Sequence, residues 1–300
     1  TLNEHTGAAD LPAAPRLGAS ANVGVGYNNL DIPALEAAGV VATNTPDVLT
    51  ETTADLGFAL LMAAARRVTE SERWLREGNW QQWSFSTMLG ADIHGSTLGI
   101  LGMGRIGQGI ARRGHHGFGM KVLYHNRSRL PETAERAIGA HYAGLDELLA
   151  QADHLVLTLP YSPASHHIID AAALAKMKPA ATLVNIARGG LVDELALADA
   201  LANGCLAAAG LDVYEGEPAV RPELLALRNV VLTPHIGSAP RATRRAMVQL
   251  AVDNLVAALG FGPRAGKPPT PVTSIKTPIT SIADAGKTAI GKRQGTSIQP

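Results

Sequence analysis

Three side chains of complementary chemistry follow three predicted strands in the second half of the chain. They are Arg188, Glu217 and His235. Open α/β sheets bind their ligands at the carboxyl ends of their strands, so we expect all three to lie at the same sheet edge. An arginine there can bind a carboxylate, and a histidine beside a carboxylate can donate or accept a proton near neutral pH. The combination predicts a site for acid–base chemistry on an anionic ligand.

Each of the three residues also has an ordinary structural interpretation. Arg188 could be a surface ion-pair partner, Glu217 a loop carboxylate, and His235 a packed or solvated loop histidine. For a lone histidine the ordinary interpretation is the better one. Three such residues at successive strand ends favour the catalytic interpretation.

A glycine-rich turn joins a predicted strand to a predicted helix in the middle of the chain. Gly102, Gly104 and Gly107 form the pattern GxGxxG. The first glycine permits a tight turn, the second lets the backbone approach a pyrophosphate, and the third allows close helix–strand packing. The N–H groups near Arg105 and Ile106 would then receive the phosphate charge. A glycine turn can merely connect two elements, but this context favours a dinucleotide site.

The end of the next strand predicts which dinucleotide is bound. An acidic residue there would hold the ribose hydroxyls of NAD, but this chain has Asn126, Arg127 and Ser128. Arg127 can form charge-assisted bonds to a 2′-phosphate, and Ser128 can donate another. We therefore predict NADP(H), with NAD(H) possible but weaker. The alternative is that Arg127 and Arg129 are solvated loop cations.

From residue 96 onward, short apolar runs alternate with helical patterns. Such alternation is typical of repeated βαβ units that form one parallel sheet. The predicted strands lie at residues 98–101, 121–124, 154–159, 182–186, 207–211 and 230–232, and the predicted helices at 106–116, 145–150, 170–177 and 194–202. The fold class is α/β, a doubly wound parallel sheet (Rossmann).

Two long predicted helices, at residues 51–67 and 239–259, flank this unit. They could carry the chain out to a second domain and back. We therefore predict an NADP-binding domain at 47–239 and a smaller, discontinuous substrate domain at 1–46 and 240–300. The Pro-, Gly- and Ser-rich ends, 1–15 and 274–300, are predicted to be disordered tails.

The composition limits the possible partners and location. The 26 Lys and Arg balance 26 Asp and Glu, which predicts no binding to nucleic acid or to an anionic membrane. The longest strongly apolar run, 58–65, is too short to span a bilayer. Cys205 is the single cysteine, which excludes an intrachain disulfide and predicts a cytoplasmic protein with a partly buried thiol. No metal-ligand set is evident.

Taken together, the motifs resemble those of the D-isomer-specific 2-hydroxyacid dehydrogenases, and most closely the glyoxylate, hydroxypyruvate and 2-ketogluconate reductases. The resemblance covers roughly residues 20–273 and its combined motifs are highly specific. They are GVGYNNLD (24–31), NTPDVLTETTADL (44–56), GILGMGRIG (99–107), NIARGGLVDE (185–194), GLDVYEGEP (210–218) and LTPHIGS (232–238).

The resemblance implies roles for individual residues. Arg188 would bind and polarise the keto acid, His235 would exchange the proton, and Glu217 would pair with His235. Backbone groups near Val25 and Gly26 would hold the substrate carboxylate. Family positions that line the cofactor correspond to Pro160, Ser165, Ile186, Asp212 and Ser238, with Asp212 near the carboxamide.

These residue types suit the implied reaction, in which a hydride from NADPH reduces a small 2-keto acid to its D-2-hydroxy acid. Hydride delivery builds negative charge on the carbonyl oxygen, so a proton must arrive from a group that titrates near neutrality. A carboxylate beside His235 favours the imidazolium. No metal is needed. We also expect a homodimer, with contacts through the predicted helix at 51–67.

The chain also departs from the family at both ends. Relatives carry further strands before the GVGYNN motif, so we expect an N-terminally truncated, flavodoxin-like substrate domain. Two alternatives therefore stay open: a catalytically weak NADP(H)-binding remnant, and a redox-sensing interaction protein. The sequence ranks neither the three keto acids nor the physiological direction.

Overall fold

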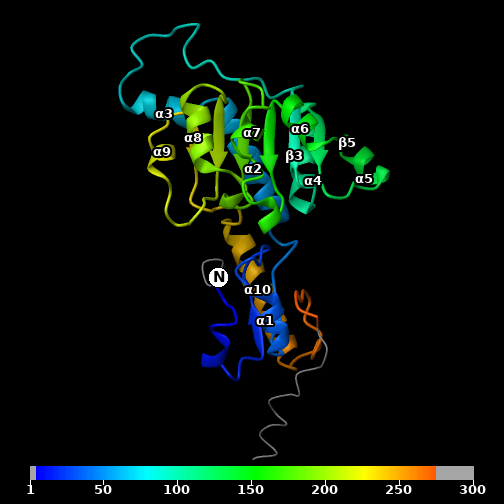
Figure 1. Cartoon of the computed structure of the whole chain (residues 1–300). Coiled ribbons are helices and arrows are strands. Elements are labelled where there is room, and N and C mark those ends of the chain that lie inside the picture. The colour runs from blue at the N-terminus through cyan, green and yellow to red at the C-terminus, as the bar shows by residue number, and fades with distance from the viewer. Residues whose placement is uncertain (1–4, 275–300) are drawn as a thin grey trace, which may run out of the picture. The chain divides into compact units, whose positions relative to one another are not determined.

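The computed structural model describes residues 5–274 of the chain (Figure 1). The chain divides into two compact units, which are described separately. The larger unit is Leu49–Ala239, and the smaller unit combines Thr1–Val48 with Pro240–Pro300.

A seven-stranded, entirely parallel sheet forms the centre of the larger unit. Its strands are β3 (Thr97–Leu101), β4 (Lys121–His125), β5 (Ala140–Tyr142), β6 (His154–Leu157), β7 (Thr182–Asn185), β8 (Ala208–Leu211) and β9 (Val230–Leu232). Their order across the sheet is β5-β4-β3-β6-β7-β8-β9. The chain thus builds outward from β3 in both directions, which places a topological switch point between β3 and β6. The prediction of a doubly wound α/β fold is confirmed.

Helices cover both faces of this sheet (Figure 1). On one face lie α2 (Thr50–Ala65) and α4 (Arg105–Arg112); on the other lie α6 (Leu145–Gln151), α7 (Ala171–Leu174) and α8 (Glu194–Ala202). Successive strand residues alternate between the two cores: Leu155 and Leu157 pack beneath α6–α8, and Val156 packs beneath α2 and α4. Because both faces are covered, the central residues of the inner strands are apolar, and polar residues stand mainly at the strand ends.

Several short elements of this unit have no counterpart in the sequence analysis. The edge strand β5 has only one buried residue, Ala140, so its three residues carry no hydrophobic pattern. The helices α3 (Val68–Arg76), α5 (Glu132–Ala137) and α9 (Pro222–Leu225) bury few residues or none. Because these four elements are short and bury at most one residue each, none has a buried hydrophobic pattern from which it could be predicted.

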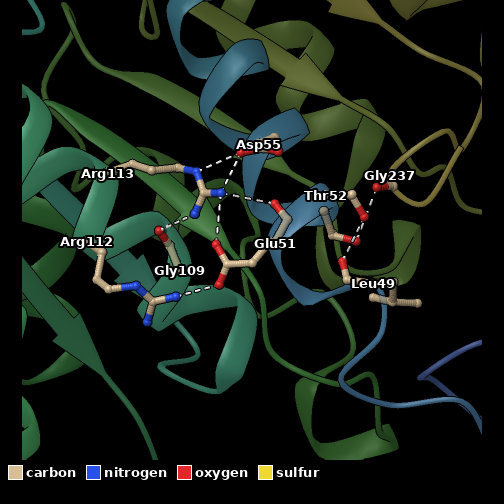
Figure 2. A network of polar contacts seen from close by, with 9 residues as sticks. Leu49, Glu51, Thr52, Asp55, Gly109, Arg112, Arg113 and Gly237 are labelled. Atoms are coloured by element: carbon tan, nitrogen blue, oxygen red, sulfur yellow. Dashed lines mark hydrogen bonds and ion pairs between the residues drawn. The ribbon is translucent and has the colours of Figure 1, made fainter. Parts of the chain in front are cut away.

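Helix α2 is part of the core of the larger unit. Its apolar side chains, including Phe58, Leu60 and Leu61, are buried. Its polar side pairs with α4 and the turn after it: Arg112 lies 2.6 Å from Glu51, and Arg113 binds both Glu51 and Asp55 (Figure 2). With its apolar face covered by the sheet, α2 has little apolar surface for the dimer contact expected of it.

The smaller unit is built on two parallel strands, β1 (Ala19–Ala21) and β2 (Val41–Thr43), joined through helix α1 (Ile32–Ala37). Helix α10 (Arg241–Ala258) packs on β1. The core consists of Leu30, Leu35, Val40 and Ala42, with partly buried apolar residues around it.

The described part of the predicted N-terminal tail is ordered, which corrects that prediction for residues 5–15. Thr6 donates its N–H to Asn29 and accepts from the N–H of Asp31, and Leu11–Ala13 form a 3₁₀ turn. Backbone hydrogen bonding to the GVGYNN segment, rather than a hydrophobic period, holds this stretch. At the other end, Ser274 donates its N–H to Glu36. The remainder of the predicted tails, 1–4 and 275–300, lies outside the described residues.

Two expectations from composition can also be compared with the structure. Among residues 5–274, no helix combines the length and apolarity that crossing a bilayer requires. Cys205 is exposed, not partly buried, because it follows the end of α8 in a surface turn.

Candidate active site

The glycine-rich turn lies between β3 and α4, and the space around its three glycines differs. Gly102 has a φ of +103°, and a Cβ there would stand 2.5 Å from the backbone nitrogen of Leu159. A Cβ on Gly107 would stand 2.4 Å from the carbonyl oxygen of Gly102. By contrast, a Cβ on Gly104 would meet no atom within 4 Å. Gly104 is thus required for no packing contact, and the space beside it is open.

Helix α4 begins at Arg105 with Gly104 as its N-cap residue and no side-chain cap. Gly104 and Arg105 are exposed. The uncapped N–H groups of a helix N-terminus attract anions. Asn126 braces the turn, because its Oδ1 accepts the N–H of Met103 at 2.7 Å. The predicted cofactor residue Asn126 therefore has a structural role at the turn itself.

The two arginines after β4 differ sharply in their surroundings. Arg129 forms a bidentate ion pair with Glu135, with both nitrogen–oxygen distances 2.8 Å. Glu135 also accepts the hydroxyl of buried Tyr124 at 2.7 Å. Hydrogen bonds from Arg129 and Tyr124 lower the pKa of Glu135 to about 2, so this carboxylate stays ionised near neutral pH. Burial and the bond to Glu135 raise the pKa of Tyr124 to about 12.

Arg127 and Ser128 are exposed, and neither forms a hydrogen bond or ion pair with any other described residue. The nearby carboxylate, Glu135, is neutralised by Arg129. Of the two cations that the sequence offered, Arg127 is therefore the one whose guanidinium is available to a ligand. A negative group that would repel a 2′-phosphate is absent from residues 126–128.

His235 and Glu217 meet at the carboxyl edge of the sheet. The Nδ1 of His235 lies 2.7 Å from Oε2 of Glu217, whose Oε1 accepts the N–H of Tyr214 at 3.0 Å. Burial raises the pKa of Glu217, but the bonds from His235 and Tyr214 and the charge of Arg188 outweigh burial and leave it below its ordinary value. Glu217 is thus a carboxylate at neutral pH. The other ring nitrogen of His235, Nε2, forms no hydrogen bond with any residue among 5–274.

The loop that carries His235 is held by buried Asp212. Its Oδ1 accepts the hydroxyl of Thr233 and the N–H of Ile236, both at 2.7 Å, and its Oδ2 accepts the N–H of Gly237 at 2.8 Å. These bonds fix His235 in the left-handed region, at φ 51°. A non-glycine residue in that region is uncommon and often marks a functional position.

Helix α2 adds a further bond to this loop, because Thr53 donates its hydroxyl to the carbonyl of Gly237 at 3.2 Å. Figure 2 shows the labelled Gly237 beside the start of α2. Asp212 and Thr53 together leave the His235 loop little freedom to move.

Arg188 follows β7 in a turn organised by Asn185. The side chain of Asn185 donates to the carbonyl of Arg188 at 2.8 Å and accepts the N–H of Ala187 at 3.0 Å. Burial lowers the pKa of Arg188, and the negative charge of Glu217 opposes that shift. Next to it, a Cβ on Gly189 would overlap the backbone of Tyr214, so this glycine lets the Arg188 loop and the Glu217 loop approach closely.

The remaining predicted cofactor residues lie on the carboxyl side of the same strands. Ser165 is buried in a capping box with Ser162, and Pro160 is exposed. The side chain of Ile186 packs on Gly57 of α2, which leaves its main chain as the part that could face a ligand. Ser238 is half-buried and follows the His235 loop.

Val25 and Gly26 lie in the smaller unit, in the loop after β1. Their carbonyls are used: Val25 accepts from the side chain of Asn44 and Gly26 from that of Asn22, both at 2.8 Å. Their N–H groups donate to no acceptor among the described residues. Two neighbouring N–H donors with fixed carbonyls can bind a carboxylate.

Sequence reasoning missed the residues that hold these loops in place. Asn185 and Glu194 are buried in the NIARGGLVDE motif, of which the sequence analysis singled out only Arg188 and Ile186. Buried Thr53 lies on the helix that was predicted from its apolar residues alone. A polar residue next to an apolar strand was the one available signal for Asn185. No local pattern reveals the partners of Thr53 and Glu194.

The steric contrast between two glycines gives a prediction. Gly104→Ala should change the free energy of unfolding by less than about 1 kcal/mol but weaken NADPH binding about tenfold or more, because its methyl group would occupy the open space. Gly107→Ala should instead destabilise the protein by about 1–3 kcal/mol. Urea denaturation and fluorescence titration with NADPH measure both effects. Unchanged NADPH affinity in Gly104→Ala would contradict the phosphate-binding role.

Comparison with known proteins gives the family. Residues 58–237 match the family described as "D-isomer specific 2-hydroxyacid dehydrogenase, NAD binding domain". The chain is 49% identical over 260 residues to glyoxylate reductase of Thermococcus onnurineus, which covers 85% of this chain and 77% of the relative. It is 51% identical over 250 residues to glyoxylate/hydroxypyruvate reductase B of Erwinia tasmaniensis, which covers 83% and 78%.

A solved structure agrees with the sequence matches. The crystal structure of an NADPH-dependent glyoxylate/hydroxypyruvate reductase from Sinorhizobium meliloti, in complex with NADP and malonate, superposes with a TM-score of 0.81 at 39% identity. The match covers 91% of this chain and 82% of that one. The chain therefore belongs to the family of D-isomer specific 2-hydroxyacid dehydrogenases, enzymes that use a nicotinamide dinucleotide, and its larger unit carries the family's dinucleotide-binding domain.

Proposed function

We propose that this enzyme reduces a small 2-keto acid, namely glyoxylate, hydroxypyruvate or 2-ketogluconate, to the D-2-hydroxy acid with NADPH. The observation that carries the proposal is the hydrogen-bonded pair His235–Glu217, at 2.7 Å, beside Arg188. Relatives named as glyoxylate and hydroxypyruvate reductases support the substrate class. They do not favour the alternatives of a binding remnant or a redox-sensing protein.

The turn at Gly102–Gly107 fits a dinucleotide. The open space at Gly104 admits a pyrophosphate, and the N-terminus of α4 offers uncapped N–H groups. We propose that Asn126, Arg127 and Ser128 bind the 2′-phosphate side, with Arg127 as the available cation. NAD(H) would bind more weakly, since it cannot use that contact.

Proton exchange is assigned to His235. Bound NADPH supplies the hydride that reduces the keto carbon, and the growing charge on the keto oxygen requires a proton. The imidazolium of His235 donates that proton from Nε2, while Glu217 holds Nδ1–H and stabilises the positive ring. Because the pKa of Glu217 is held low, this pairing is lost only when the pH falls far below neutrality.

Arg188 has the role of binding the substrate. Its guanidinium offers a planar set of donors that suits a carboxylate beside a keto oxygen, and its partial burial strengthens that attraction. Holding the substrate in one orientation replaces a collision with a fixed near-attack geometry. We further propose that the N–H groups of Val25 and Gly26 bind a substrate carboxylate. Asp212 and Ser238, with the main chain at Pro160, Ser165 and Ile186, would line the cofactor.

The product tests the proposed reaction. We expect incubation of the purified enzyme with NADPH and hydroxypyruvate to give the D-hydroxy acid, identified by chiral chromatography. NADPH deuterated at the transferred position should place one deuterium at C2 of that product. An L-product, or deuterium elsewhere, would contradict the assigned chemistry.

We also propose that the enzyme is a homodimer that uses the segment after α3. Trp80, Trp83, Phe85 and Leu89 are all more than half exposed there, and Phe85 is 87% exposed. Monomers rarely expose such an apolar group, whereas aromatic residues are enriched at interfaces. A second copy of the chain is the expected occupant.

The dimer proposal predicts a change of mass. Light scattering should give a dimer for the wild type and a monomer for Trp83→Ser/Phe85→Ser, because the variant loses its most exposed aromatic anchors. Val252→Ser, an exposed apolar position on α10, is the matched control and should remain dimeric. A monomeric wild type, or a dimeric double variant, would contradict the proposal.

A further inference from the structure

Two adjacent histidines and a carboxylate from a distant loop form a compact group in the larger unit. They are His166, His167 and Glu215, whose ligand atoms all lie within 4.8 Å of one another. The Nε2 of His167 is 3.1 Å from Oε2 of Glu215. None of the three belongs to the residues assigned to proton transfer or to the cofactor.

The backbone brings both rings to one side. Neighbouring side chains of an extended segment point in opposite directions, so adjacent histidines do not ordinarily share a ligand. Here His167 adopts the left-handed region at φ 48°, and the two rings stack with centroids 3.8 Å apart. Because His166 is exposed, its ring can turn toward an ion without disturbing the core.

The carboxylate is held in place by a separate set of contacts. Buried Glu194 accepts the N–H of Glu215 at 2.7 Å, and the missing Cβ of Gly189 lets that backbone approach. The competing cation, Arg221, stands 4.0 Å from Oε2 of Glu215, farther than His167 does. Glu215 is therefore directed at the histidine pair more closely than at the arginine.

An outer partner is also present for His166. Its Nδ1 lies 3.3 Å from the hydroxyl of Tyr161. Histidines that bind metals commonly engage a hydrogen-bond partner with the ring nitrogen opposite the metal. The contact with Tyr161 thus leaves Nε2 of His166 for an ion.

We propose that His166, His167 and Glu215 bind a divalent transition-metal ion of the zinc type. Two imidazoles and one carboxylate are a ligand set that suits Zn²⁺, with open positions for water, whereas Mg²⁺ prefers oxygen ligands alone. No spacing in the sequence indicates this ligand set, since 47 residues lie between His167 and Glu215 in the chain. The site is not needed for the reaction, and its existence does not depend on the proposed function.

Metal binding would nevertheless affect turnover. Glu215 lies two residues before Glu217, so an ion that draws Glu215 toward the histidines would act on the loop that holds His235. We therefore expect bound Zn²⁺ to inhibit the enzyme.

Isothermal titration of the full chain, freed of any affinity tag, with ZnCl₂ tests the proposal directly. We expect one Zn²⁺ per chain at micromolar concentration and no binding of MgCl₂. His166→Ala, His167→Asn and Glu215→Gln should each weaken Zn²⁺ at least about tenfold, as loss of a ligand costs no less than loss of an outer partner. Asparagine is chosen at position 167 because it tolerates a positive φ.

A second adjacent histidine pair provides the matched control. His115 and His116 meet edge-on with centroids 4.8 Å apart, and neither belongs to a three-ligand group among residues 5–274. The variant His115→Ala/His116→Ala should bind Zn²⁺ like the wild type, with circular dichroism confirming that every variant is folded. Absence of Zn²⁺ binding to the wild type, or unchanged affinity in folded His166→Ala and Glu215→Gln, would overturn the proposal.

Discussion

His235→Asn is expected to lower kcat by at least about 100-fold while leaving the Kd for NADPH nearly unchanged. The substitution removes the ring that donates the proton, but asparagine accepts the left-handed backbone that Asp212 imposes at this position. Steady-state kinetics and NADPH fluorescence titration measure the two quantities separately.

Glu217→Gln separates the role of the ring from that of its partner. The amide oxygen can still accept the N–H of Tyr214, so the loop should keep its shape, but the imidazolium loses its negative partner. We expect a smaller loss of kcat than in His235→Asn, and a change of no more than about 1 kcal/mol in the free energy of unfolding. Wild-type turnover in His235→Asn would remove His235 from its assigned role.

Arg127→Ala is expected to raise the KM for NADPH by about 10–100-fold and to leave the KM for NADH nearly unchanged. Hydrogen bonds to charged groups contribute about 1.5–3 kcal/mol, which corresponds to that range. NADH carries no 2′-phosphate and so loses nothing. The ratio of kcat/KM for the two cofactors, measured on one preparation, reports the change in preference.

Arg129→Ala is the matched control for this prediction. Its guanidinium is already bound to Glu135 through Nε and Nη2, so its removal should disturb the Tyr124–Glu135 pair without changing the preference for NADPH. Equal losses for NADPH and NADH in Arg127→Ala would contradict the assignment of the 2′-phosphate. If Arg129→Ala instead lowered the preference for NADPH over NADH, the 2′-phosphate would have to be assigned to Arg129.

Local patterns were enough to predict the sheet and its cofactor turn. Buried parallel strands are continuous apolar runs. At Gly102 and Gly107 the turn has no room for a Cβ, and at Gly104 a Cβ would occupy the space proposed for a phosphate. The short edge strand β5 and the ordered segment at residues 5–15 carry no such pattern, because they are held by backbone hydrogen bonds. Their absence from the predictions follows from that difference.

Contacts between distant segments mark the limit of what the sequence could reveal. The sequence pointed to Arg127 for the 2′-phosphate but did not reveal what Arg129 binds, because its partner Glu135 is brought to it by α5. In the same way, the grouping of His166 and His167 with Glu215 requires a left-handed backbone at one histidine and a close approach at Gly189. Neither condition leaves a recognisable spacing in the sequence.

Turnover with each of the three keto acids, followed by the absorbance of NADPH and repeated with NADH, decides whether the proposed reaction takes place. We predict NADPH-dependent reduction of at least one of glyoxylate, hydroxypyruvate and 2-ketogluconate, with a higher kcat/KM for NADPH than for NADH. Tight NADPH binding without turnover of any of the three would contradict the account.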